Sequence, residues 1–194
     1  MNTDISFDLE TLGVDPGCVI TQIGACAFNA DASPGAVGVA ERQMFNVFVD
    51  PQSCLDIGMT IKWSTIAWWF EQPDAARKAM VTKETTHIAK ALDELRRWIG
   101  AVGDPMAIRV WGHGATFDIS LLEDAYRRIG LKVPWFYRNV RDLRTLRALA
   151  PPNLELTAPS AELNAHIAVD DAIMQADWIT QCTAALRTGG SPNG

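Results

Sequence analysis

The chain has 194 residues, 48% of them hydrophobic, which is enough to bury one core but short for two full domains. No run approaches the roughly 20 apolar residues that cross a bilayer, and the N-terminus lacks a basic segment followed by an apolar one, so we expect a cytoplasmic protein without a membrane partner. The net charge of −6 argues against binding nucleic acid by bulk electrostatics. It leaves room for an enzyme that meets phosphates through metal ions held by clustered carboxylates.

Apolar periodicity and turn residues predict an alternation of strands and helices. In chain order these are strands over 4–9, 18–28 and 43–49, helices over 60–70 and 85–100, a strand over 107–111, a helix over 115–129, a strand over 138–141, a helix over 142–149, a loop over 151–165 and a last helix over 168–186. The turn at 15–17 predicts that the first two strands pair antiparallel. The order predicts an α/β fold with a mixed sheet.

Two acids, Asp8 and Glu10, stand near the end of the first predicted strand. Residues two apart on a strand point to the same face, so both carboxylates project together. Such a pair is unfavourable unless a cation or a proton lies between the two charges. Acids are also common at exposed strand ends, but the apolar neighbours of this pair indicate a central strand.

Asp118 opens the helix that follows the segment WGHGATFD. It shares a helical stripe with Leu122, Ala125 and Ile129, at intervals of four, three and four. An acid in a first turn can simply favour the helix dipole. Because Asp118 continues an apolar stripe, a buried functional site is the better interpretation.

The last predicted helix carries two adjacent acids, of which Asp171 is expected to be the buried one. Its stripe is shared with Ile167, Met174, Trp178 and Cys182. Its neighbour Asp170 shares a face with Asp177 and Gln181, which is typical of a solvated side.

His166 precedes Asp171 by five residues, about 140° around a continuous helix. Placed instead on the loop before the helix, it can reach the open side of an acidic cluster. A single histidine is more often a surface or core residue.

Carboxylates from one strand and two helix starts can converge on Mg²⁺ or Mn²⁺, and two such ions can clamp the attacking and leaving oxygens of a phosphodiester. A histidine can then take the proton from water.

Together, these motifs resemble those of the DEDDh 3′→5′ exonucleases of the ribonuclease H-like superfamily. The family's D-x-E matches Asp8 and Glu10, its second acid matches Asp118 in WGHGATFD, and its H-x4-D matches His166 and Asp171 in HIAVDD. The similarity is greatest to the branch that holds the exonuclease domain of bacterial exonuclease VIII and related phage and mycobacterial enzymes. It runs to about residue 185 and includes FDLETLG, residues 66–69 and residues 139–145.

The resemblance implies a ribonuclease H-like mixed five-stranded sheet flanked by helices, forming one exonuclease domain over 1–187 with a flexible tail over 188–194. It implies two divalent ions, Mg²⁺ or Mn²⁺, held by Asp8, Glu10, Asp118 and Asp171, with His166 as general base. The implied substrate is single-stranded RNA or DNA with a free 3′ end, in a bacterial or phage-encoded protein. A homodimer is also compatible with the resemblance.

Substrate contacts are expected from residues in or beside these motifs, namely Thr11, Leu12, Trp68, Trp69, His113 and Phe117. The two tryptophans are adjacent, so one is expected to pack while the other can stack on a base. Packing alone is an equally good explanation. His113 stands where this branch is expected to have Asn, and we give it no catalytic role. Asp142 is left out of the ligands.

Arg141, Arg144 and Arg147 recur every third residue and could form a basic ridge for the phosphate backbone. A solvated face is slightly favoured as the explanation.

The main alternative function is a catalytically inactive ribonuclease H-like module that binds nucleic acid. Retention of all four acids favours the enzyme. An endonuclease on the same fold is the second alternative, and the H-x4-D motif favours the exonuclease. The sequence does not decide between RNA and DNA as the substrate.

Overall fold

The computed structural model describes residues 3–159 and 162–189, and its strands form one five-stranded sheet in the order β3-β2-β1-β4-β5. β1 pairs antiparallel with β2 and parallel with β4, so the sheet is mixed. The expected antiparallel pairing of the first two strands is thereby confirmed. The strands are β1 (Asp4–Thr11), β2 (Ile20–Phe28), β3 (Met44–Phe48), β4 (Arg109–Gly112) and β5 (Val140–Asp142).

Seven α-helices lie around the sheet in the described part of the chain. They are α1 (Pro51–Asp56), α2 (Trp63–Phe70), α3 (Asp74–Met80), α4 (Ile88–Val102), α5 (Asp118–Arg128), α6 (Leu143–Leu149) and α7 (Ala168–Gly189), with 3-10 turns at Val39–Glu41 and Tyr137–Asn139. The sequence did not predict α1 and α3, which are too short to show a helical period. None of the described helices is long and apolar enough to cross a membrane.

Two of the expected helices have different boundaries in the structure. The helix expected from residue 115 begins at Asp118. The last helix runs to Gly189, past the boundary expected at residue 187, and residues 190–194 of the expected tail lie outside the described residues.

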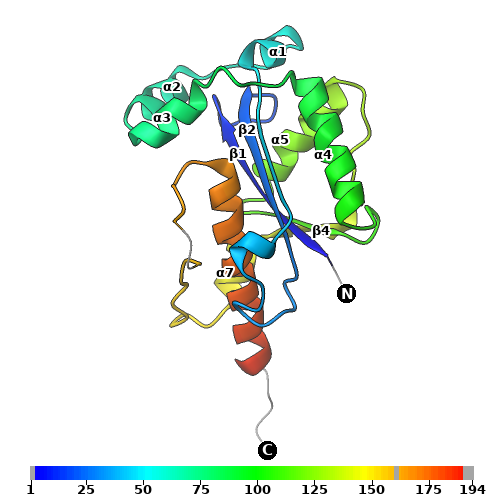
Figure 1. Cartoon of the computed structure of the whole chain (residues 1–194), viewed down its shortest axis with the longest axis vertical. Helices are drawn as coiled ribbons and strands as arrows, with labels where there is room; N and C mark the ends of the chain where they lie inside the picture. The colour runs from blue at the N-terminus through cyan, green and yellow to red at the C-terminus, as the bar shows by residue number, and fades with distance from the viewer. Residues whose placement is uncertain (1–2, 160–161, 190–194) are drawn as a thin grey trace, which may run out of the picture.

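β1 is central, and its two faces differ in chemistry. Ile5, Phe7 and Leu9 point into the main hydrophobic core together with side chains of α4 and α5. The alternate residues of β1 are polar and face α7, which packs on β1 and β2. Figure 1 shows α7 on one side of these strands and α4 and α5 on the other. Polar groups of β1 are therefore covered by a helix and need partners there.

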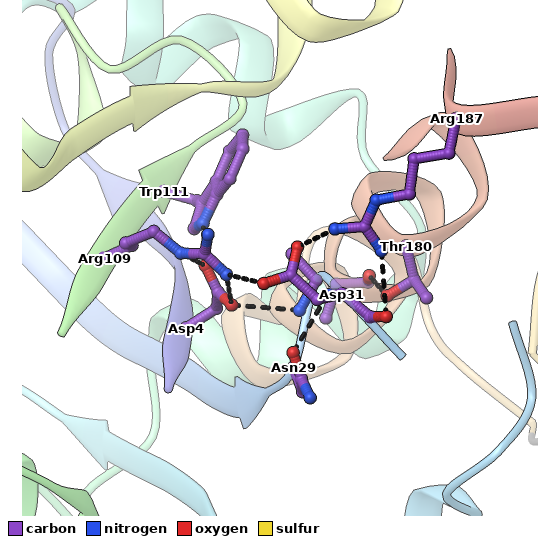
Figure 2. Close-up of polar contacts among 9 residues, drawn as sticks. Asp4, Asn29, Asp31, Arg109, Trp111, Thr180 and Arg187 are labelled. Carbon is purple, nitrogen blue, oxygen red and sulfur yellow. Dashed lines mark hydrogen bonds and ion pairs between the residues drawn. The ribbon is translucent and has the colours of Figure 1, made fainter. Parts of the chain in front are cut away.

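At the start of β1, such partners are present. Asp4 accepts two hydrogen bonds of 2.7 Å from the guanidinium of Arg109 on β4. Arg109 also pairs with Asp31, which in turn pairs with Arg187 near the end of α7 (Figure 2). This network fastens the far end of α7 to the sheet.

Candidate active site

The acids singled out in the sequence meet where the α7-covered face of β1 approaches its end. They line one cavity of about 560 Å³ together with His166. Asp8 and Glu10 come from β1, Asp118 from the first turn of α5, and Asp171 from the first turn of α7. The structure thus brings together five residues from three distant parts of the sequence.

A glycine on β2 lets α7 reach this position. Gly24 lies directly opposite Asp8 in the β1–β2 register. A Cβ atom at Gly24 would lie well under 3.0 Å from backbone atoms of Ala168 and Val169, a separation that real Cβ atoms essentially never show. The backbone of the first turn of α7 therefore packs directly on the strand, as a glycine inside a strand often allows.

Gln22 fixes the same turn of α7 from the sheet. Its side-chain oxygen accepts a hydrogen bond of 3.2 Å from the backbone N–H of Ala168, and its amide nitrogen donates to Asn46 at 2.8 Å. One unpaired N–H group at the start of α7 is satisfied in this way. Gln22 and Gly24 were not singled out in the sequence, although a glycine within a predicted strand is a usable signal of close backbone approach.

Asp118 is held against the end of β4. Its side chain is only 3% exposed, which agrees with the predicted core-facing stripe. A Cβ atom at Gly112 would lie 2.9 Å from Oδ2 of Asp118, so the glycine makes room for the carboxylate. Because β4 pairs parallel with β1, Asp118 lies beside the two acids of β1.

Asp8 is oriented by a second polar residue of α7. Nε2 of Gln175 donates to Oδ1 of Asp8 at 2.8 Å. The hydroxyl of Ser6 donates to Oε1 of Gln175 at 3.3 Å, which fixes which end of the amide faces Asp8. Gln175 follows Asp171 by four residues and so shares its helix face, a spacing that could have identified it from the sequence.

His166 lies just before α7 in a backbone conformation that residues other than glycine seldom adopt, with φ of 63°. Its backbone N–H donates to Oδ2 of Asp171 at 2.8 Å. Its ring meets Trp68 edge-on, with centroids 5.0 Å apart. A conformation of this kind costs roughly 1–3 kcal/mol and persists where the surroundings impose it, often at functional sites.

Burial is the largest cause of a raised pKa in each of the four carboxyl groups. The pKa of Asp8 lies well above its usual value through burial and the charges of Asp118, Glu10 and Asp171. Burial, with Asp171 and Asp118, raises the pKa of Glu10 to about 8. The pKa of Asp118 rises to about 7, although backbone hydrogen bonds lower it. Burial also raises the pKa of Asp171, against a hydrogen bond from the His166 backbone.

The arrangement fits divalent cations. Ligand atoms of Glu10, His166 and Asp171 all lie within 4.8 Å of one another. Within residues 3–159 and 162–189, no lysine or arginine forms an ion pair with any of the four acids. Carboxylates that share a buried pocket without a cationic partner repel one another, and oxygen-binding ions such as Mg²⁺ and Mn²⁺ relieve this repulsion.

A second, more apolar cavity of about 410 Å³ adjoins the acids. It shares Leu9, Glu10, Trp68 and Phe117 with the acidic cavity and also contains Thr11, Val14, Ser64, Thr65 and Trp69. Trp69 is 2% exposed, and its ring N–H donates to the carbonyl of Thr11 at 2.9 Å. Trp68 is 42% exposed and borders both cavities. The exposed indole is therefore the one whose face is available for stacking.

Of the other expected substrate contacts, His113 lies exposed in the acidic cavity. Partial burial of its ring and the charge of Arg144 lower the pKa of His113. Leu12 lines neither cavity. It is buried in the main core, so its position does not support the expectation of a substrate contact.

The face of α7 that was expected to be solvated is largely covered. Asp177 is 8% exposed and forms an ion pair of 2.5 Å with Arg42. Gln181 exchanges hydrogen bonds with Thr157 of the preceding loop. Asp170 accepts from the backbone N–H of Asn164 at 2.9 Å. The expectation was wrong because the 3-10 turn at Val39–Glu41 and the loop before α7 pack on this face, which helical periodicity cannot show.

Comparison with known proteins gives the following findings. A family model described as 3′-5′ exoribonuclease Rv2179c-like domain matches residues 3–183. No curated protein sequence matches the chain. The solved nuclease domain of 3′hExo, described as a DEDDh family member bound to rAMP, is 14% identical, with 97% of this chain and 93% of that chain covered and a TM-score of 0.60.

Two further structures give similar values. Cell-death related nuclease 4 is 15% identical, with 97% of this chain and 65% of that chain covered and a TM-score of 0.59. An exonuclease I from Methylocaldum szegediense is 16% identical, with 98% and 42% covered and a TM-score of 0.62. The chain thus spans about two thirds of the former and less than half of the latter. At such identities the likeness concerns the fold.

Proposed function

The chain belongs to the family of 3′-5′ exoribonuclease Rv2179c-like domains and has the ribonuclease H-like exonuclease fold, and on this premise we propose that it removes nucleotides from the 3′ end of single-stranded RNA. The choice of RNA over DNA follows the description of the family. The observation that carries the proposal is the meeting of four acids, two buried and two half-buried, beside an apolar pocket, with no cationic partner among the described residues. That pocket, at about 410 Å³, falls within the range of small-molecule sites.

The proposed ligands of two divalent ions, Mg²⁺ or Mn²⁺, are Asp8, Glu10, Asp118 and Asp171. Bound there, the ions would supply neutralising charge to the attacking and leaving oxygens of a phosphodiester. Gln175 holds one oxygen of Asp8 and so orients this carboxylate within the cluster. Burial first, and then the charges of the neighbouring acids, raise the pKa values of Asp8 and Glu10, and cation binding would relieve the repulsion between these charges.

In this proposal the chain itself binds the terminal nucleoside and moves a proton. The apolar pocket receives the base and ribose, with Trp68 as the stacking surface. A ring nitrogen of His166, within 4.8 Å of ligand oxygens of Glu10 and Asp171, accepts the proton of the attacking water. The left-handed backbone of His166, tied to Asp171, holds the ring over the acids.

The test is digestion of a 5′-labelled single-stranded oligoribonucleotide with Mg²⁺ or Mn²⁺. A ladder of products that shortens from the 3′ end, with release of mononucleotides, is expected. Asp118→Asn should lower the rate on the order of 10³-fold or more while the protein stays folded. A matched DNA oligonucleotide measures the preference for RNA.

Other outcomes would contradict the proposal in distinct ways. Cleavage of a circular strand would indicate an endonuclease. Tight binding of RNA without turnover, unchanged by Asp118→Asn, would favour the inactive binding module. A homodimer, compatible with the resemblance, stays a prediction that light scattering of the purified protein can test.

A further inference from the structure

Of the three arginines Arg141, Arg144 and Arg147, in β5 and α6, one is not engaged by the protein. Arg141 donates to the carbonyls of Arg138 and Val140 at 2.8 and 2.9 Å. Arg147 donates to the carbonyl of Leu154 at 2.7 Å. Arg144, which is exposed, has no hydrogen bond or ion pair with any residue that the structure describes. The three arginines therefore have different surroundings, and among them only Arg144 keeps all of its side-chain donors available.

Arg144 lies at the acidic cavity. It lines that cavity beside His113 and is not part of the apolar one. Its guanidinium lies over Gly114, since a Cβ atom there would be 3.3 Å from Nη1 and 3.4 Å from Cζ. The cationic group thus borders the site at a place that the terminal nucleoside, seated in the apolar pocket, does not occupy.

The nearest acid on the same segment is already engaged. Oδ1 of Asp142 accepts from the backbone N–H and the hydroxyl of Thr145, at 2.7 and 2.8 Å. Its Oδ2 accepts from the backbone N–H of Ala115 at 2.7 Å. These bonds fasten the loop over residues 113–117 to the start of α6, so the surface under Arg144 is fixed while its guanidinium stays open to a ligand.

The direction of the bound strand follows from the two cavities, if the proposed function holds. A terminal nucleoside in the apolar pocket places the scissile phosphodiester at the four acids. The rest of the chain must then leave through the part of the acidic cavity away from that pocket, where Arg144 lies. A guanidinium suits a phosphate there because its planar donors match two phosphate oxygens.

We propose that Arg144 forms a separate phosphate subsite, which binds the phosphate one nucleotide upstream of the scissile one, that is, the 5′-phosphate of the penultimate nucleotide. This inference rests on the proposed function. With this subsite the enzyme would bind a second phosphate in addition to the scissile one. It should therefore prefer substrates that carry the 5′-phosphate of the penultimate nucleotide.

The experiment compares two diribonucleotides that differ only in this group. NpN contains the scissile phosphate alone, and pNpN adds the 5′-phosphate of the penultimate nucleotide. The wild-type protein should cleave pNpN with the higher kcat/KM. Arg144→Ala should lower the pNpN/NpN ratio of kcat/KM about tenfold, toward one, mainly through KM, since a charge-assisted hydrogen bond is lost. Arg144→Lys should retain part of the preference and Arg144→Gln little of it.

Arg141→Ala is the matched control, because its guanidinium is bound to backbone carbonyls, and it should keep the wild-type ratio. Thermal unfolding of each variant checks the fold. An unchanged ratio in Arg144→Ala, with both dinucleotides cleaved, would overturn the subsite and leave the exonuclease intact. Equal loss on both dinucleotides would also overturn it, by placing Arg144 at the scissile phosphate. If the wild-type protein trims the longer oligoribonucleotide but cleaves neither dinucleotide, the subsite is overturned and the exonuclease stands. If it digests neither the oligoribonucleotide nor the dinucleotides, the proposed function fails and the subsite with it.

Discussion

On the face of β1 that α7 covers, Asp4 and Asp8 lie in opposite surroundings. Asp4 is 0% exposed and accepts four hydrogen bonds, two from Arg109, one from the indole of Trp111 at 2.7 Å and one from the backbone of Ala30 at 2.9 Å (Figure 2). Asp8 receives one side-chain hydrogen bond, from Gln175, and its nearest charges are other acids.

The difference separates two uses of a buried acid. A buried charge is costly unless hydrogen bonds and an opposite charge compensate it. At Asp4 the fold supplies both, so this acid joins β1, β4 and the end of α7. At Asp8 the fold supplies one side-chain hydrogen bond and, among the described residues, no cationic partner, so a bound cation would have to supply the opposite charge. Both acids lie on the same strand face, so the distinction lies in their partners.

Replacing each acid by its amide should change stability in opposite directions. Asp4→Asn leaves Arg109 without its main partner and should lower the free energy of unfolding by about 3 kcal/mol, the lower range for breaking a buried pair, because Arg109 keeps Asp31. Asp8→Asn removes a repulsive charge and should raise that free energy by about 1 kcal/mol in the absence of divalent ions. Urea unfolding in the presence of a chelator measures both. Similar losses in the two variants would remove the contrast.

The single donor to Asp8 offers a finer test. Gln175→Met keeps much of the side-chain volume but removes the hydrogen bond to Asp8, and it should weaken Mn²⁺ binding about tenfold, as is common for residues that orient a metal ligand. Titration calorimetry on the RNA-free protein gives this affinity. Gln181→Met, on the same helix but bonded to Thr157, is the control and should bind Mn²⁺ as the wild-type protein does. Equal affinities in all three proteins would mean that Asp8 needs no orienting partner.

A further effect concerns pH. The folded-state pKa values of Glu10, about 8, and Asp118, about 7, lie above their ordinary values, so the folded state holds these protons more tightly than the unfolded one. The stability that this adds is fully present below the ordinary values of 4.5 and 3.8 and is lost as pH rises toward 8. The metal-free protein should lose at least about 1 kcal/mol over this range, or about 2–4 °C in Tm.

Divalent ions should reverse this trend, because they replace the protons. Mn²⁺ should therefore raise Tm more at pH 8 than at pH 5, which differential scanning fluorimetry can show. In Asp118→Asn both the pH trend and the effect of Mn²⁺ should shrink. A Tm of the metal-free protein that rises between pH 5 and 8 would contradict the assignment of uncompensated acids.

The sequence predicted those parts of the site that depend on local spacing. Asp118 was assigned to a buried face because the period of its own helix shows it, and the first strand pair followed from a turn. The sequence analysis did not identify Gln22, Gly24 and Gln175 as parts of the site. Their roles depend on contacts of α7 with β1 and β2, and α7 lies far from both strands in the sequence. Asp177 was misjudged for the same reason: Arg42, its partner, lies 135 positions away.

The close packing of α7 on Gly24 bears on how the chain folds. Asp8 and Gln175 are separated by 167 positions, and α7 is the last described helix. Contacts of such long range carry a loop-closure cost that packing repays only afterwards, which slows their formation. An intermediate with a formed sheet but an undocked α7 would lack Asp171 and His166 at the acids. The proposed nuclease activity therefore depends on the docking of α7, and a chain in which α7 is undocked is expected to leave RNA uncut.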